Sequence, residues 1–288
     1  MSTKAIEIQN VSYRYSQGTN QEVTAIKNIN LTIEKGEIIG IIGHTGSGKS
    51  TLVSHFNGLL KPTEGKVIVD GTDIWRDKET LRNARFKVGL CFQYPEYQLF
   101  EETVYKDISF GPKNMKLSES EIKERVLKAA DFTGIRKDML EKSPFDLSGG
   151  EKRRVAIAGI MAMEPEVLVF DEPAAGLDPA GRKNLIKLIE EYHEQTGSTV
   201  IVVSHNMEDI ARLAQRIIVI NNGAIAMDGT VKEVFSRGEE LKQMGLNVPE
   251  ITEVFIKLKN MGYDVPLDVY TVKYGAEILR SLKERGRE

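Results

Sequence analysis

The feature that most constrains this chain is a glycine-rich loop directly behind an apolar stretch. The apolar stretch covers Ile38–Ile42, and residues 43–51 read GHTGSGKST. This matches every fixed position of the pattern G-x-x-x-x-G-K-[ST], which predicts a buried strand, a phosphate-binding loop and the start of a helix. Backbone N–H groups of such a loop and the helix N-terminus surround phosphate groups. A chance glycine-rich turn does not account for so complete a match, so a nucleoside triphosphate is the expected ligand.

Each part of this loop has a task in holding a triphosphate. The glycines allow the backbone to close around the β-phosphate. Lys49 places a positive charge at the β- and γ-phosphates, and the hydroxyl of Ser50 can bind Mg²⁺. The predicted phosphate site comprises Gly43, His44, Thr45, Gly46, Ser47, Gly48, Lys49, Ser50 and Thr51.

Two consecutive carboxylates follow a second apolar stretch. Residues 167–172 read VLVFDE, which predicts a buried strand that ends at the edge where parallel sheets bind ligands. Asp171 is suited to hold Mg²⁺, and Glu172 is suited to orient or deprotonate the attacking water. An isolated acidic pair usually marks a solvated strand end, but the phosphate loop upstream favours a catalytic role.

Apolar patterning predicts an α/β chain with a parallel sheet as its core. Period-two alternation near the N-terminus favours a small antiparallel sheet. Continuous apolar runs separated by helical segments favour a buried parallel sheet. The alternating runs are residues 6–11, 29–33 and 67–69, and the continuous runs are 167–170, 200–203 and 217–220.

A helical insertion and a helical extension complete the predicted organisation. Ser118 and Glu121 form a capping-box pattern at the start of an amphipathic stretch, inside an insertion at about residues 94–165. Two further amphipathic helices are expected in residues 241–288, after a nucleotide-binding domain of residues 1–240. The apolar pattern of the extension fits a cover for the main domain and a role in subunit association equally well.

Composition narrows the classes of partner and location. The formal net charge is −3, so the chain lacks the basic excess of nucleic-acid-binding proteins. No apolar run approaches the ~18 residues of a membrane-spanning helix. The single cysteine, Cys91, excludes an intramolecular disulfide and suits a reducing compartment. Its apolar neighbours indicate a buried side chain without chemistry, and a cytoplasmic location is expected.

A second anion-binding element lies at residues 147–151, which read LSGGE. Bare N–H groups, the Ser148 hydroxyl and a helix N-terminus together suit an anion. This element resembles the signature loop of the ATP-binding-cassette family, with Glu151 in place of the commoner glutamine. The resemblance implies that the signature loop of one subunit closes on ATP held by the phosphate loop of its neighbour. The partner in this head-to-tail dimer would be an identical or a paralogous subunit.

Other positions also resemble that family. Tyr15 is similar to the aromatic residue that stacks on adenine, Gln93 to the glutamine that joins Mg²⁺ to the helical insertion, and His205 to the histidine at the γ-phosphate. Residues 176–178, which read GLD, resemble the loop that contacts the opposite subunit. The resemblance implies that Glu172, His205, Gln93 and Lys49 are catalytic, that Ser50, Gln93 and Asp171 hold Mg²⁺, and that ATP contacts Tyr15, the phosphate loop, Ser148, Gly149 and Gly150.

A narrower resemblance follows Gln93. Residues 94–100 read YPEYQLF and residues 107–112 read DISFGP, which is similar to ATPases of energy-coupling-factor transporters. His44 and Thr45 are similar to the second of the two paralogous ATPases there. This resemblance implies a peripheral protein on the cytoplasmic face of the membrane, with a membrane-embedded scaffold and a separate membrane protein that binds a vitamin or a transition-metal ion. A conventional importer subunit, a soluble ABC ATPase and a non-hydrolytic regulatory subunit are the alternatives.

Overall fold

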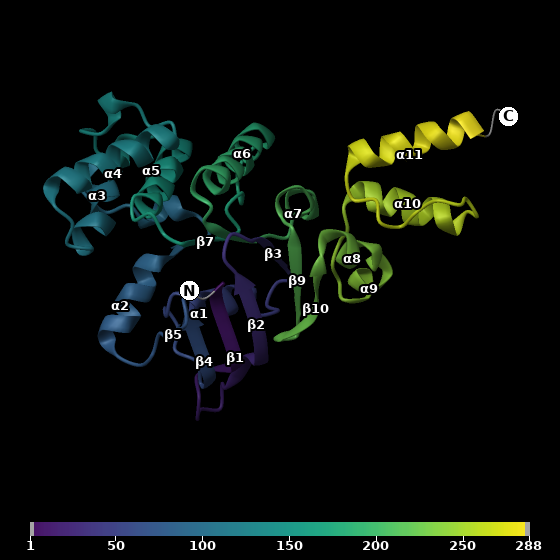
Figure 1. Cartoon of the computed structure of the whole chain (residues 1–288), viewed down its shortest axis with the longest axis horizontal. Helices are drawn as coiled ribbons and strands as arrows, with labels where there is room; N and C mark the ends of the chain where they lie inside the picture. The colour runs from purple at the N-terminus through teal and green to yellow at the C-terminus, as the bar shows by residue number, and fades with distance from the viewer. Residues whose placement is uncertain (1–2, 286–288) are drawn as a thin grey trace.

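The computed structural model describes residues 3–285 and contains two sheets, a helical lobe and a C-terminal helical segment (Figure 1). The strands are β1 (Lys4–Tyr15), β2 (Val23–Glu34), β3 (Ile38–Ile42), β4 (Glu64–Val69), β5 (Thr72–Asp73), β6 (Val88–Cys91), β7 (Val167–Asp171), β8 (Thr199–Val203), β9 (Arg216–Asn221) and β10 (Ala224–Thr230). The α-helices are α1 (Lys49–Phe56), α2 (Lys78–Lys87), α3 (Val104–Asn114), α4 (Glu119–Phe132), α5 (Gly149–Met161), α6 (Pro179–Thr196), α7 (Met207–Leu213), α8 (Val231–Ser236), α9 (Gly238–Gln243), α10 (Glu250–Asn260) and α11 (Val272–Arg285). Short 3₁₀ helices are η1 (Pro95–Gln98), η2 (Lys137–Met139) and η3 (Pro144–Asp146).

The larger sheet carries its strands in the order β10-β9-β3-β8-β7-β6. β3 pairs in parallel with β8 and β9, and β7 pairs in parallel with β6 and β8, whereas β10 runs antiparallel to β9. Every residue of β3, β7 and β8 is buried, which explains why these strands are apolar at consecutive positions. The predicted parallel sheet is confirmed, and its topology brings the ends of β3, β7 and β8 to one edge.

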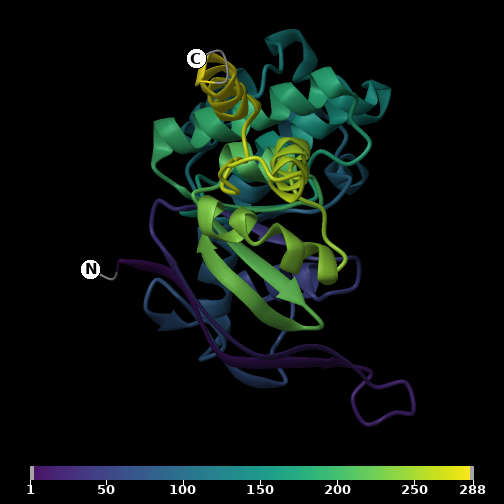
Figure 2. The same cartoon turned by 90° about the vertical axis from the view of Figure 1, so that its right-hand side faces the viewer.

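The smaller sheet is antiparallel, in the order β2-β1-β4-β5, as the alternating pattern predicts. It shares a core with α1 and one face of the larger sheet, in which Ile6, Ile26, Ile41 and Phe56 are fully buried. Figure 2 shows β1 and β2 on the opposite side of the molecule from most of the helices. The phosphate loop and α1 therefore lie between two sheets.

The helical lobe consists of α3, α4 and α5, at the opposite end of the molecule from α10 and α11 (Figure 1). The predicted capping box is present, since the Ser118 backbone N–H donates to the Glu121 carboxylate at 2.8 Å and the Ser118 side chain caps the Glu121 N–H. The apolar stripe of α4, which includes Ile122 and Val126, is buried. This confirms the predicted helix and its inward face.

The C-terminal segment forms the two predicted helices, α10 and α11. They pack around a small cluster of Phe255, Val265 and Val269. Met261, just after α10, and Val272, at the start of α11, are 72% and 73% exposed, so this segment covers only part of its own apolar surface. No helix in the described range, residues 3–285, is long and apolar enough to cross a membrane.

Candidate nucleotide site

The phosphate loop connects the end of β3 to the start of α1. Gly46 and Gly48 have φ of +80° and +106°, a region that side-chain-bearing residues rarely adopt. A Cβ on Gly48 would lie 2.6 Å from the Ala25 carbonyl oxygen, and one on Gly43 would collide with the Ile220 carbonyl oxygen. The glycines are therefore required by the backbone path itself, and the loop wraps around the N-terminus of α1.

Lys49 is buried at the base of this loop. Its Nζ donates to the carbonyl oxygens of Gly43 at 2.7 Å and His44 at 2.9 Å. Burial lowers the pKa of Lys49, and the nearby carboxylates of Glu172 and Asp171 act in the opposite direction. The side chain thus holds the loop closed around a cationic centre, which suits a polyphosphate.

Asp171 ends β7 beside the start of α1. Burial raises the pKa of Asp171, while a hydrogen bond from Ser50 and the charge of Lys49 lower it. Its Oδ1 is buried without a hydrogen-bond partner among the described residues. An orphaned carboxylate oxygen beside a hydroxyl is a hard-oxygen donor set of the kind that Mg²⁺ accepts, so the residues present fit this ion.

Glu172 and His205 meet at the same edge of the sheet. The Nδ1 of His205 lies 2.8 Å from the Glu172 carboxylate, although the two residues are far apart in sequence. Glu172 has φ of +52°, and its backbone N–H donates to Val203 in β8 at 2.9 Å. A non-glycine residue in this conformation is strained, and such strain clusters at functional sites. The parallel order of β7 and β8 positions the acid against the histidine.

Tyr15 lies at the outer end of β1, on the approach to α1. Its hydroxyl is 3.1 Å from the Thr51 Oγ1, its ring packs edge-on against Tyr13, and the side chain is 42% exposed. A ring that is anchored at its hydroxyl and open on its surface can stack on a planar base.

Within residues 3–285, no hydrogen bond or ion pair joins the signature loop to the phosphate loop. Ser148 caps α5, and its hydroxyl and backbone N–H both donate to the Glu151 carboxylate, at 2.7 and 2.9 Å. A Cβ on Gly149 or Gly150 would meet nothing within 4 Å. The carboxylate of Glu151, which stands where the family usually has glutamine, is therefore already bonded to Ser148. The loop faces open space at a helix N-terminus.

Gln93 and Cys91 lie on either side of the end of β6. Gln93 follows β6 and is exposed, on the stretch that leads to η1. Burial raises the pKa of Cys91 to about 12, which agrees with the expectation that it has no chemistry. Glu96 lies in the stretch of residues 94–100, but its pairing with Arg153 was not predicted: the two side chains form a largely buried ion pair at 2.8 Å beside the loop that follows Glu172. Their sequence separation gives no local signal of this pairing.

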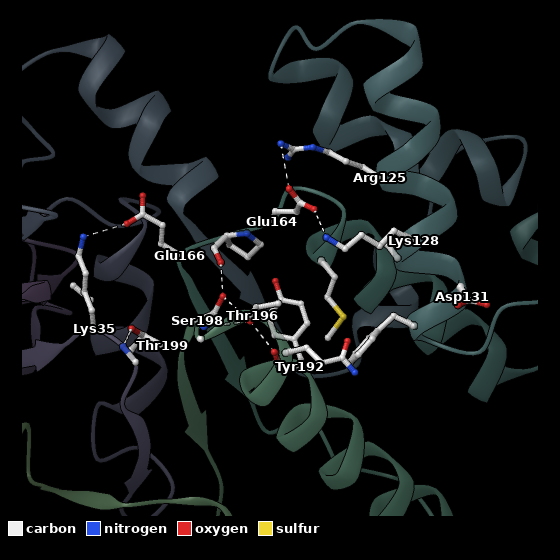
Figure 3. Close-up of a pocket in the computed structure, with 18 residues that line it drawn as sticks. Lys35, Arg125, Lys128, Asp131, Glu164, Glu166, Tyr192, Thr196, Ser198 and Thr199 are labelled. Carbon is white, nitrogen blue, oxygen red and sulfur yellow. Dashed lines mark hydrogen bonds and ion pairs between the residues drawn. The ribbon is translucent and has the colours of Figure 1, made fainter.

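A cavity of about 720 Å³ lies at the opposite edge of the sheet, beside the residues that precede β3, β7 and β8 (Figure 3). Five of its charged side chains form ion pairs with one another: Glu164 with Lys128 at 2.8 Å and with Arg125 at 3.3 Å, and Lys35 with Glu166 at 3.6 Å. In the described part of the chain, none of the phosphate-loop residues 43–51 lines this cavity. The cavity is therefore a gap between the helical lobe and the sheet that is lined by ion pairs.

Comparison with known proteins agrees with the geometry. Residues 26–175 match the family model described as ABC transporter. The energy-coupling factor transporter ATP-binding protein EcfA2 of Caldanaerobacter subterraneus subsp. tengcongensis is 54% identical, over 96% of this chain and 98% of that protein. The protein of the same name from Clostridium perfringens is 51% identical, over 96% of this chain and 97% of that protein.

Solved structures give the same assignment. CbiO1 of Clostridium perfringens, described as part of the ABC transporter complex CbiONQ, is 38% identical with a TM-score of 0.74, over 91% of this chain and 98% of that chain. The ATP-binding cassette MJ0796, solved as a dimer with ADP and phosphate, is 31% identical with a TM-score of 0.69, over 78% of this chain and 98% of that chain. The chain belongs to the ABC transporter family of ATPases, among the ATP-binding subunits of energy-coupling factor transporters.

Proposed function

We propose that this chain is the subunit that hydrolyses ATP on the cytoplasmic face of an energy-coupling-factor importer, with Glu172 as the residue that activates water. The observation that carries the proposal is the contact of Glu172 with His205 beside the phosphate loop, at 2.8 Å. A base at the edge of a polyphosphate site, with its orientation fixed by a second residue, is the arrangement that hydrolysis of a γ-phosphate requires.

ATP binding follows from the proposed roles of the loop residues. The triphosphate occupies the loop of residues 43–51, Lys49 turns its Nζ from the loop carbonyls toward the β- and γ-phosphates, and adenine stacks on Tyr15. Ser50, Asp171 and Gln93 would hold Mg²⁺, which neutralises charge on the phosphate oxygens when it is bound.

Hydrolysis then uses this chain's own acid and histidine. A water molecule attacks the γ-phosphorus, the bond from that phosphorus to the bridging oxygen of ADP breaks, and Glu172 accepts the proton that the water releases. His205 lies beside Glu172 and can donate a hydrogen bond to a γ-phosphate oxygen. ADP and inorganic phosphate are the products, and the strained backbone of Glu172 keeps its carboxylate aimed at the water.

The open signature loop supports a dimer as the working unit. Among the described residues, Ser148, Gly149 and Gly150 form no hydrogen bond with this chain's own phosphate loop, and a helix N-terminus left open is an anion site. We propose that these residues complete the ATP site of a second subunit, identical or paralogous. The dimeric structure of MJ0796 with ADP and phosphate supports this arrangement by relationship.

A groove on the helical lobe supports a membrane partner. It has a volume of about 310 Å³ and is lined in part by Leu99, Phe100, Phe110 and Met163. Phe100 and Phe110 are 58% and 46% exposed, with their rings edge to face at 4.9 Å. Exposed aromatic anchors in a groove suit an amphipathic helix. We assign the groove to the membrane scaffold, and the choice of a vitamin or transition-metal ion to a separate membrane protein.

The domain division belongs to the same proposal. Residues 1–240 form the nucleotide-binding domain with its helical subdomain at about 94–165, and residues 241–288 form the extension. The exposed Met261 and Val272 favour a role of the extension in contact with another subunit.

We expect Tyr15→Ala to weaken ATP binding. Removal of an aromatic ring from a stacked base costs ~1–3 kcal/mol, which corresponds to roughly 5- to 150-fold in Kd. Titration calorimetry with ATP measures the change. Tyr15→Phe is the matched control, because it keeps the ring and loses only the bond to Thr51, so its Kd stays near the wild-type value. Equal affinity of Tyr15→Ala and wild type would exclude stacking.

The proposed membrane partner is tested by co-purification from detergent-solubilised membranes with an affinity tag on this chain. We expect a scaffold subunit to co-purify with wild type, and Phe110→Ser to reduce its yield by about tenfold, because loss of an aromatic anchor costs ~1–2 kcal/mol. Leu59→Ser, at an exposed apolar residue outside the groove, is the control. Equal yields from the two variants would refute docking in this groove.

A further inference from the structure

Arg153 connects three functional segments through one buried side chain. It lies on α5, two residues after the signature loop ends at Glu151, and it is 5% exposed. Its Nε and Nη2 donate to the two carboxylate oxygens of Glu96 in η1, at 2.9 and 2.8 Å. Its Nη1 donates to the carbonyl oxygens of Pro173 at 3.3 Å and Ala175 at 3.0 Å.

The two carbonyls belong to the loop that leaves Glu172. Pro173 is the next residue in the chain, and Ala175 precedes Gly176, which has φ of +74°. The same loop is contacted a second time, because a Cβ on Gly176 would lie 3.4 Å from the Tyr94 ring. The loop of residues 173–176 is therefore held from one side by α5 and by the segment that contains η1.

Glu172 depends on this support for its geometry. Its backbone is in the left-handed region, which persists only where the surroundings over-determine it. Before the loop, the Glu172 N–H is tied to Val203. After Glu172, the Arg153 guanidinium donates to the Pro173 and Ala175 carbonyls. Arg153 is held in turn by two hydrogen bonds to the Glu96 carboxylate. A shift of η1 would therefore move Arg153 and the loop of residues 173–176 with it.

We propose that Arg153 is a positioning residue for ATP hydrolysis, which holds the backbone after Glu172 so that the carboxylate is aimed at the attacking water. This inference rests on the proposed function of Glu172. Arg153 touches no reacting atom. A guanidinium is needed because it donates to the carboxylate and to the two carbonyls at once, which the single ammonium of lysine cannot do in this geometry.

The experiment compares steady-state ATP hydrolysis by wild type, Arg153→Lys and Glu96→Gln in the full-length chain, isolated with the subunits that co-purify. We expect Arg153→Lys to lower kcat by about 10- to 100-fold, because a small displacement of a reacting group has effects of this size. Its KM and its ATP affinity in calorimetry stay near wild type. Glu96→Gln keeps one acceptor for Arg153, so its kcat lies between the other two.

Asp228→Asn is the matched control. The Asp228 carboxylate accepts two hydrogen bonds, from the Nε and Nη2 of Arg216, at 2.6 and 2.7 Å in the β9–β10 hairpin. Loss of this pair changes the melting temperature without changing kcat. A merely structural role of Arg153 would give its variants the same behaviour, a lower melting temperature with kcat within about twofold of wild type, and this outcome would overturn the inference.

Three further outcomes are distinguished by the same measurements. If Arg153→Lys does not fold, Glu96→Gln decides: a lowered kcat at unchanged KM supports the inference, and an unchanged kcat in a folded but destabilised protein overturns it. If wild type shows no hydrolysis that Glu172→Gln removes, the proposed function of Glu172 fails. If that hydrolysis is present and both variants retain it fully, only the role of Arg153 fails.

Discussion

Glu172→Gln is expected to lower the rate of ATP hydrolysis by a factor on the order of 10² to 10⁴, the usual contribution of a general base. The amide has nearly the shape of the carboxylate and can still accept a hydrogen bond from His205, but it cannot take a proton from water. The backbone at φ of +52° is unaffected by a change at the end of the side chain. Single-turnover hydrolysis measures the chemical step directly.

Binding is expected to survive this substitution. Lys49 and the phosphate loop remain in place, so the ATP affinity in calorimetry stays within a few fold of wild type and the dimer still closes on ATP. Glu190→Gln is the control, because it changes a glutamate in α6 that pairs with Arg212 at 2.7 Å and contributes nothing to the site. A single-turnover rate for Glu172→Gln equal to that of wild type would refute its role as the base.

The parts of this fold that sequence predicted are those with a local physical signature. β3 and β7 are apolar at consecutive positions because both of their faces are buried. The start of α4 is marked by a capping box whose two partners are three residues apart. The phosphate loop is marked by glycines whose conformations no other residue adopts easily. In each case the cause lies within a few residues of the effect.

The parts that sequence did not predict depend on contacts between distant segments. β10 was not anticipated, and its half-exposed pattern is stabilised by pairing with β9. The ion pair of Arg153 with Glu96 joins residues 57 positions apart, and neither residue is unusual within its own segment. Such a pair can be identified only from the folded chain, in which α5 packs beside η1.

The signature loop shows a local signal that sequence analysis left unused. Ser148 and Glu151 have the same spacing as Ser118 and Glu121, and the structure contains the capping box in both helices. Glu151 is thus a capping residue of α5 as well as a departure from the family's glutamine. The carboxylate lowers its own pKa by accepting bonds from Ser148, so it is ionised at neutral pH and stabilises the start of α5. Glutamate in place of glutamine at position 151 thus caps α5 and adds a negative charge beside the anion site.

Lys49→Ala tests the binding half of the site, and we expect it to weaken ATP binding. A hydrogen bond to a charged group contributes about 1.5–3 kcal/mol, so loss of the ammonium raises the Kd for ATP by roughly 10- to 150-fold. The wild-type Nζ is held at the base of the loop by the carbonyls of Gly43 and His44, and it turns from them toward the phosphates when ATP binds. Titration calorimetry with ATP measures the affinity.

Lys128→Ala is the control for Lys49→Ala, because Lys128 is a surface lysine that pairs with Glu164 on the far side of the sheet. Its loss leaves the phosphate loop intact, so the Kd stays near the wild-type value. The comparison separates a local charge from the general effect of removing one lysine. If Lys49→Ala bound ATP as tightly as Lys128→Ala, the triphosphate would have to be held by loop N–H groups alone, and the cationic centre at the base of the loop would have no part in binding.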